Sequence, residues 1–188
     1  MAACQYTGKI DHTEKTIQAL FRAEYHAYEM PRILIRMGIG VALVFAAVFL
    51  TLPTWARAVL MLFGAWFLVS GDFPSQIRAD KAVEARHGVL PGMRYEFFDD
   101  RVKLTGEGSM TIPYKKFARL TQDREYLYLF LSKDSVCMLE RATLKPAKPE
   151  AFMKFIEEKT GLAWRREFSL LTLNLADLLQ ISGDRHRK

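Results

Sequence analysis

The sequence predicts an α+β protein in which a two-helix transmembrane hairpin precedes a small antiparallel β-barrel capped by a C-terminal helix. Two uncharged apolar runs, residues 37–52 and 58–71, predict the hairpin. Six short segments with strand character predict the barrel. An amphipathic pattern after Pro149 predicts the capping helix. With 188 residues, the chain has room for one hairpin and one ordinary domain.

Residues 1–31 are expected to form a strand and an amphipathic helix. Residues 4–10 alternate loosely, and Asp11 with Glu14 three residues later resembles the capping box that opens a helix. Apolar residues then recur at spacings of three and four, which predicts one apolar stripe opposite a polar face that includes Glu29. Because the charges on that face are mixed, packing against the soluble domain is favoured over binding to the membrane surface.

Residues 32–73 have the composition of a membrane hairpin. Residues 33–52 supply 20 positions, and about 20 helical residues cross a hydrocarbon core of ~30 Å. The second run reaches spanning length only if it starts at Pro53 and continues to near Phe73. A buried soluble hairpin is disfavoured because helices this apolar on every face are rare in soluble proteins. A cleaved signal peptide is disfavoured because no small-residue cleavage pattern follows the first run.

Lys and Arg flank the hairpin unevenly. They cluster before the first run and after the second, whereas the connecting turn contains only Arg57. The positive-inside rule therefore predicts a two-pass protein of the cell (inner) membrane with both termini in the cytoplasm. Attraction to anionic headgroups and the amphipathic tryptophan ring predict contacts at the membrane interface, although the positive-inside bias alone would also place basic residues there. The expected interface residues are Arg32, Arg36, Trp55, Arg57, Arg78, Lys81 and Arg86.

The soluble part is expected to begin with a juxtamembrane helix and linker over residues 74–92, with Ser75 as the helix cap and Gly88 as its C-terminal stop. Residues 93–164 then predict one antiparallel, strongly curved sheet, followed by a helix from Pro149 to Gly161 that covers one end of it. The six expected strands are residues 95–98, 101–105, 109–112, 117–121, 126–131 and 136–139.

The C-terminal tail, residues 165–188, is rich in leucine. Phe168, Leu171, Leu175, Leu178 and Leu179 fit a helical stripe, while residues 171–175 also alternate like a strand. The helix is favoured, and we hypothesise that its stripe covers domain surface, because an exposed stripe would form an interaction-prone patch.

The order of these elements carries a resemblance to a known family. It rests on residues 95–100 (YEFFDD), 111–114 (TIPY), 126–131 (YLYLFL), 152–161 (FMKFIEEKTG) and Trp164. In this order after a hairpin, they resemble the YcxB-like family of bacterial two-pass membrane proteins. The resemblance implies a cytoplasmic pleckstrin-homology-like domain on a helical hairpin. Family members often carry a Pro-Lys pair where this chain has Glu140 and Arg141, and no functional residue is carried over.

The residues provide little support for catalysis. His12, His26, His87 and His186 lack metal-ligand spacing, and the two cysteines, Cys4 and Cys137, are too far apart in sequence to suggest a metal site or a disulfide framework. No glycine-rich phosphate loop lies in the right structural context. We therefore expect a protein that is not an enzyme, without cofactor or metal. The net charge of +6 comes with no nucleic-acid-binding motif, so nucleic acid is not an expected partner.

These observations favour a membrane-anchored cytoplasmic adaptor, a binding module whose partners are the lipid bilayer and a protein, a peptide or a second copy of the chain. The alternative is a structural subunit that assembles through the hairpin. Small residues at Gly38, Ala42 and Ala46 would allow another helix to pack closely there.

Overall fold

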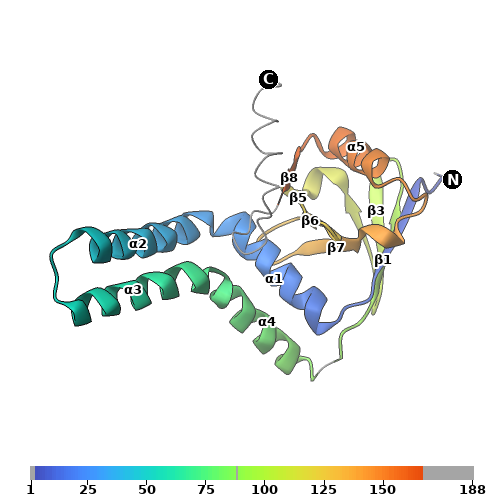
Figure 1. Ribbon diagram of the computed structural model, residues 1–188. Coiled ribbons are helices and arrows are strands. Elements are labelled where there is room, and N and C mark those ends of the chain that lie inside the picture. Colours follow the sequence, from blue (N-terminus) through green and yellow to red (C-terminus); the bar gives the residue numbers. More distant parts are fainter. Residues whose placement is uncertain (1–2, 88, 167–188) are drawn as a thin grey trace. The chain divides into compact units, whose positions relative to one another are not determined.

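The computed structural model describes residues 3–87 and 89–166, and over this range the chain is α+β. The described residues divide into two compact units. The hairpin unit consists of residues 30–71, and the sheet unit consists of residues 3–29 and 72–166 without residue 88. Figure 1 shows the elements of each unit along the chain. Each unit is described separately below.

The hairpin unit contains two long helices, α2 (Met30–Phe49) and α3 (Thr54–Val69), which lie side by side (Figure 1). By length and composition, α2 is apolar enough to span a membrane. The second helix is shorter than expected: Pro53 is its N-cap, and it ends at Val69. A 3-10 turn, η1 (Ser70–Asp72), follows. Gly71 and Asp72 are poor helix formers, which accounts for the early end.

The two helices approach each other most closely at two glycines. A Cβ atom built on Gly64 would lie 2.7 Å from Val44 Cγ2 and 3.0 Å from the carbonyl oxygen of Gly40. One built on Gly40 would lie 2.9 Å from Leu68 Cγ. By contrast, nothing lies within 4 Å of a Cβ on Gly38. The hairpin is therefore packed through Gly40 and Gly64, and Gly38 lies away from this contact.

The first sheet contains β1 (Tyr6–Ile10), β2 (Met93–Phe97), β3 (Arg101–Thr105) and β4 (Ser109–Pro113), in that order and all antiparallel. The strand expected near the N-terminus is thus confirmed and has a specific neighbour, since Tyr6 pairs with Phe97. The chain leaves the sheet after β1 and returns as β2 beside it. The helical hairpin is consequently an insertion between two adjacent strands.

The second sheet contains β5 (Arg119–Gln122), β6 (Tyr126–Phe130), β7 (Val136–Glu140) and β8 (Trp164–Arg166) in the order β7-β6-β5-β8. The six expected strands are therefore present, with ends displaced by at most two residues. They do not form the single antiparallel sheet that was expected. There are two four-stranded sheets in the described part of the chain, and β8 runs parallel to β5.

The change of sheet occurs between β4 and β5. Pro113 ends β4, and the 3-10 turn η2 (Tyr114–Lys116) follows it. A proline has no backbone N–H to donate to a ladder, so it is a natural end for paired structure. No ladder joins β4 to β5 within the described residues, and the two sheets are not closed into a barrel by strand pairing.

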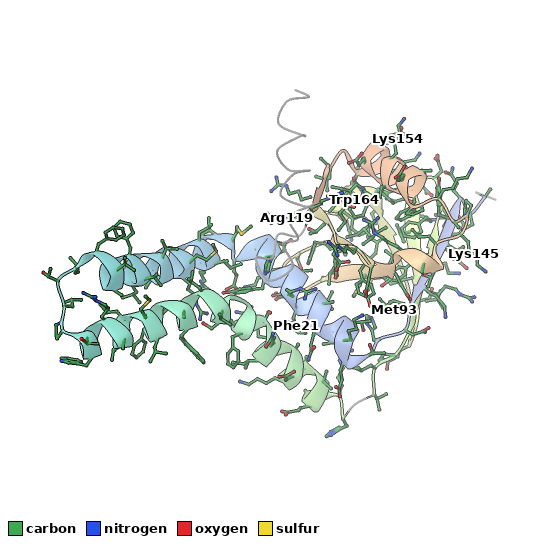
Figure 2. The ribbon with its side chains drawn as sticks, in the orientation of Figure 1. Phe21, Met93, Arg119, Lys145, Lys154 and Trp164 are labelled. Atoms are coloured by element: carbon green, nitrogen blue, oxygen red, sulfur yellow. The ribbon has the colours of Figure 1, made fainter. Side chains whose placement is uncertain are left out.

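Helix α5 (Pro149–Thr160) packs its apolar face against strands and ends at Gly161, as predicted. The phenyl ring of Phe152 lies 5.3 Å from the ring of Tyr6 and 4.8 Å from that of Phe97. Trp164 then donates from its indole Nε1 to the carbonyl oxygen of Met153 at 3.0 Å. In Figure 2, Trp164 lies near Arg119 of the neighbouring β5, whereas Lys154 points outward from α5.

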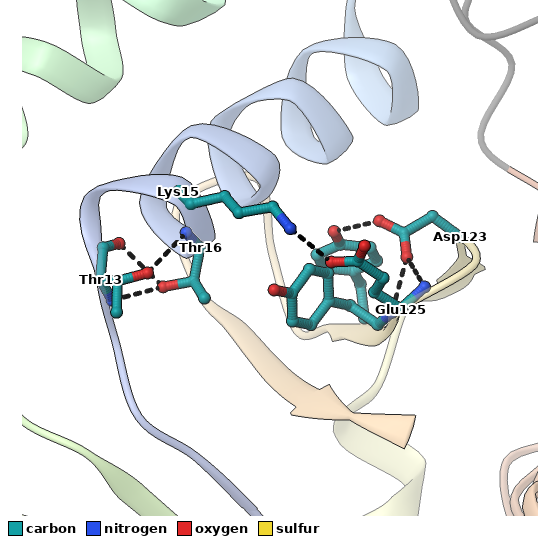
Figure 3. Close-up of polar contacts among 7 residues, drawn as sticks. Thr13, Lys15, Thr16, Asp123 and Glu125 are labelled. Atoms are coloured by element: carbon teal, nitrogen blue, oxygen red, sulfur yellow. Dashed lines mark hydrogen bonds and ion pairs between the residues drawn. The ribbon is translucent and has the colours of Figure 1, made fainter. Parts of the chain in front are cut away.

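Two further helices of the sheet unit, α1 (Glu14–Tyr28) and α4 (Phe73–Ala85), pack against each other. The predicted capping box at Asp11 and Glu14 is wrong, because the N-cap is Thr13. The Thr16 backbone N–H donates to Thr13 Oγ1, and the Thr13 N–H donates to Thr16 Oγ1 (Figure 3). A threonine hydroxyl, like a carboxylate, can accept from the backbone N–H groups exposed at the start of a helix.

The expected cap of α4 is also wrong. The helix begins at Phe73, so Ser75 is its third residue, and Ser75 is buried. Pro74 occupies the first turn, where its missing N–H costs nothing. Gly88, expected as the C-terminal stop, lies outside the described residues. Of the segment 165–188, Arg165 and Arg166 belong to β8, and the predicted leucine stripe lies outside the described residues.

Candidate functional site

Four of the residues expected at the membrane interface lie in the hairpin unit, at its two ends. Arg32 and Arg36 are in the first two turns of α2, and Arg36 Nη2 donates to Ser70 Oγ at 3.0 Å. Trp55 and Arg57 are exposed in the first turn of α3, beside the turn between the helices. The interior of the hairpin between these ends contains no Lys, Arg, Asp or Glu.

The other three expected interface residues lie at or just beyond α4 and have different surroundings. Lys81 and Arg86 are exposed. Arg78 is bound within the sheet unit: its Nη1 atom donates to Glu29 Oε1 at 3.0 Å and lies 3.8 Å from Glu24 Oε1. Arg78 therefore has a role inside the protein that the sequence did not suggest.

The carboxylate of Glu29 joins three elements of the sheet unit. Glu29 is the C-cap residue of α1, and its side chain is only 6% exposed. Besides Arg78 of α4, it accepts a bond of 2.8 Å from Nζ of Lys133, which lies between β6 and β7. We refer to Glu24, Glu29, Arg78 and Lys133 as the Glu29 cluster. Bonds to charged partners are stronger than neutral ones, so this cluster fixes α1 and α4 against the second sheet.

The location of the Glu29 cluster along the chain is as informative as its geometry. Glu29 immediately precedes Met30, the first residue of α2, and α4 begins directly after η1. The two chain segments that enter and leave the hairpin are thus both held by one buried carboxylate. A change in either segment would have to break or distort an ion pair that also holds the β6–β7 connection.

Burial dominates the electrostatic balance of Glu24, one of the two acidic members of the cluster. Burial raises the pKa of Glu24 above its ordinary value, and the nearby positive charges of Arg78 and Lys133 only partly offset this effect. The charged form of Glu24 is therefore less favourable in the folded protein than in the unfolded chain. Glu24 lies at the margin of the cluster, with its side chain 13% exposed.

A second set of contacts also holds α1 against the second sheet. The guanidinium of Arg119 lies 4.8 Å from the ring centroid of Tyr28, a cation–π arrangement, and the Tyr28 ring meets the edge of Phe130 at 5.6 Å. Near the start of α1, Lys15 Nζ forms an ion pair of 3.0 Å with Glu125 (Figure 3). The adjacent turn is closed by Asp123, which accepts from two backbone N–H groups and the Tyr128 hydroxyl.

Sequence reasoning missed the Glu29 cluster because it assigned Glu29 to the polar, exposed face of its helix. Helical periodicity treats every residue outside the apolar stripe as exposed, but Glu29 is the capping residue beyond the last turn. One signal was available. Two acidic residues, Glu24 and Glu29, lie just before the first apolar run, and a basic residue, Arg78, lies just after the second.

Two observations concern metal binding and thiol chemistry in the described residues. Among residues 3–87 and 89–166, no group of three His, Cys, Asp or Glu side chains could hold a metal ion. Cys137 is buried in β7, and burial raises the pKa of its thiol to about 12. A thiol with that pKa is not a nucleophile at neutral pH. The Glu29 cluster holds α1, α4 and the β6–β7 connection together, and its carboxylates are paired with Arg78 and Lys133.

Comparison with known proteins supports the family resemblance over part of the chain. Residues 97–156 match the family model described as YcxB-like protein. No curated protein and no solved structure matches the chain. The matched residues run from the last residue of β2 through β3, β4, β5, β6 and β7 and into α5. The matched segment, residues 97–156, is therefore similar to YcxB-like proteins, as the sequence motifs within it indicated.

Proposed function

We propose that this protein is a membrane-anchored adaptor. The hairpin unit crosses the cell (inner) membrane twice with both termini in the cytoplasm, and the sheet unit, of pleckstrin-homology-like type, binds a protein or peptide partner at the membrane surface. The observation that carries the proposal is the insertion of an apolar helical hairpin between two adjacent strands of a well-packed domain.

The outer surface of the hairpin supports membrane anchoring. The 20 residues of α2 correspond to ~30 Å, the thickness of the hydrocarbon core. Large apolar side chains are exposed along both helices, which is the reverse of a soluble helix pair. They include Leu34, Ile35, Phe45, Phe49, Leu62, Phe63 and Trp66. The 16 residues of α3 give ~24 Å, so the second crossing requires η1 or local thinning of the bilayer.

The interior and edge of the sheet unit support binding at its surface. Phe97, Phe130 and Phe152 are fully buried between the elements, so side chains fill the interior. β4, by contrast, is an outer strand of its sheet, and its Met110 side chain is 61% exposed. Outer strands are where proteins accept an extended peptide as an added strand. These features favour a peptide or protein partner over a small molecule enclosed in the domain.

The topology can be tested with two single cysteines in a Cys4→Ser background, where buried Cys137 does not react. Thr51→Cys lies in the turn of the hairpin and Lys116→Cys on the sheet unit, and both positions are exposed. A membrane-impermeant maleimide should label position 51 from outside spheroplasts and position 116 only in inverted vesicles. Labelling of both positions from the same side, or recovery of the protein without membranes, would refute the anchoring.

Partner binding can be tested by photo-crosslinking in native membranes. A photoreactive residue replaces Met110 on β4 or, as a control away from that edge, Lys154 on α5. The adaptor proposal expects a discrete crosslink at position 110 that persists when the hairpin is replaced by an unrelated one. A crosslink lost with the native hairpin would instead identify a structural subunit, and no crosslink at position 110 would refute binding at this edge.

The structural-subunit alternative has one observation in its favour. The small residue Gly38 faces open space, and Ala42 one turn later is exposed. Small residues allow two membrane helices to approach closely. This surface is separate from the Gly40 and Gly64 contact inside the hairpin, so the two functions can be distinguished by substitution.

A further inference from the structure

We propose that the first two turns of α4 lie in the lipid interface, with Phe73 and Ile77 in contact with lipid. The inference rests on the membrane anchoring proposed above and extends it to the sheet unit. It assigns α4 a membrane-facing side, in addition to the side that packs against α1.

The two sides of α4 differ clearly in burial. Ser75 and Ala79 are buried, and α4 packs against α1. Each helical residue turns by about 100°, so Phe73 and Ile77 point about 200° away from Ser75 and Ala79. Consistent with this geometry, Phe73 is 49% exposed and Ile77 is 44% exposed. The packing of the sheet unit thus leaves two large apolar side chains, one turn apart, on its surface.

The length of chain between α3 and α4 identifies lipid as the occupant of this surface. Phe73 follows Val69, the last residue of α3, by four residues, and the three residues between them form the 3-10 turn η1. A 3-10 helix rises ~2 Å per residue, so Phe73 lies within ~8 Å of the end of α3 along the chain. The polar interface on each side of a bilayer is ~5–8 Å thick. Where α3 ends at the edge of the hydrocarbon core, Phe73 therefore remains within reach of it. Ile77 follows one turn later, which adds ~6 Å along the helix.

The charges on α4 limit how much of the helix contacts the membrane. Beyond Ile77 the exposed residues of α4 are Asp80, Lys81, Glu84 and Ala85. Carboxylates are repelled by anionic headgroups, so the lipid contact ends after the second turn. Arg78, which directly follows Ile77, does not mediate the contact, because it is turned toward Glu29 and Glu24. The interaction at this point is therefore apolar.

Spin-label accessibility in vesicles tests the inference with the full chain. Single cysteines in the Cys4→Ser background carry a nitroxide at Ile77, at Leu62 in α3, or at Met110 on β4. The vesicles contain phosphatidylcholine and phosphatidylglycerol. Leu62 is 71% exposed and reports the spanning helix, and Met110 is an exposed apolar residue far along the chain from the hairpin. Oxygen partitions into lipid, whereas a neutral nickel chelate stays in water, and their collision rates distinguish the two environments.

The expected result is oxygen-dominated collision at positions 62 and 77 and nickel-dominated collision at position 110. Nickel-dominated collision at position 77 with a lipid signal at position 62 would overturn the inference but leave the anchoring intact. A water signal at position 62 would refute the anchoring itself. Protection of position 77 from both reagents would indicate a protein partner and also overturn the inference. A label at Phe73 gives an independent measurement if the Ile77 variant does not fold.

Discussion

Substitution of Gly64 by alanine should loosen the hairpin, whereas the same substitution at Gly38 should not. The added Cβ at position 64 would lie 2.7 Å from Val44 Cγ2, 3.0 Å from the Gly40 carbonyl oxygen and 3.1 Å from the Val44 nitrogen. Ordinary contacts between non-bonded carbons are about 3.5–4.0 Å, so the helices must separate by ~1 Å. Two of the three contacted atoms belong to the backbone, which cannot move aside as a flexible side chain would.

The energetic cost follows from the same geometry. Overpacking of this kind costs about 1–3 kcal/mol. Replacement of glycine by alanine in a helix gains up to about 1 kcal/mol in helix propensity, and this gain is shared by both substitutions. The difference in stability between Gly64→Ala and Gly38→Ala therefore isolates the packing contribution and should be about 1–3 kcal/mol. Val44→Ala should restore only part of the loss, because the contact with the Gly40 carbonyl remains.

The assay is a titration of the full chain in mixed micelles with a denaturing detergent, followed through the distance between spin labels on the two helices. Gly64→Ala should separate the helices and lower the transition midpoint, and Gly38→Ala should match or exceed the wild type. Equal midpoints for Gly64→Ala and the wild type would refute the close-packing argument. Equal damage by the two substitutions would show that a partner helix packs against Gly38, as the structural-subunit alternative requires.

Three further predictions concern the sheet unit. Glu29→Gln should lower the free energy of unfolding by about 2 kcal/mol, since a buried carboxylate with two cationic partners is lost. Glu125→Gln, in the exposed pair with Lys15, should cost clearly less. Denaturant titration compares the two variants, and equal losses would contradict the role of the cluster. The pKa of Glu24 is raised on folding, so the native state binds more protons than the unfolded chain in the pH window just above the ordinary carboxyl pKa. The stability contribution of Glu24 is therefore fully present below its unfolded pKa and is lost as pH rises through its folded pKa. Glu24→Gln should therefore flatten this part of the stability profile and slightly stabilise the protein at neutral pH; an unchanged profile would show that Glu24 does not titrate there. Finally, a maleimide should modify exposed Cys4 but not Cys137 in the folded protein at pH 7, and both after unfolding, as mass spectrometry would show; rapid native labelling of Cys137 would contradict its burial.

Local sequence patterns were sufficient for much of the secondary structure. The strand over residues 101–105 was predicted with its observed ends, and the helix from Pro149 to Gly161 was predicted with both its start and its stop. These features depend on backbone sterics and on the period of apolar residues, which are properties of neighbouring residues. Glycine at position 161 adopts φ of +71°, a conformation that few other residues tolerate, so its role as a stop was already evident from its identity.

The candidate site required the tertiary structure. Of the seven expected interface residues, Arg78 is the one whose position changed the interpretation, because Glu29 and Glu24 bind it within the sheet unit. Lys133, the other cation of the cluster, lies 104 residues from Glu29 in sequence. No local pattern relates residues so far apart, and a charged residue beside an apolar run is expected at a membrane boundary whether or not it has a buried partner.

The sequence by itself determined the apolar hairpin, the succession of strands and the covering helix, because hydrophobic periodicity and turn residues act over a few positions. The tertiary structure alone decided that β1 pairs with β2, which follows the hairpin in the chain, and that the strands divide into two sheets. It also decided that Glu29 holds both segments leading to the hairpin. Those features depend on which distant segments bury their surfaces together. That choice is made by the packing of the whole sheet unit and leaves no local periodicity in the chain.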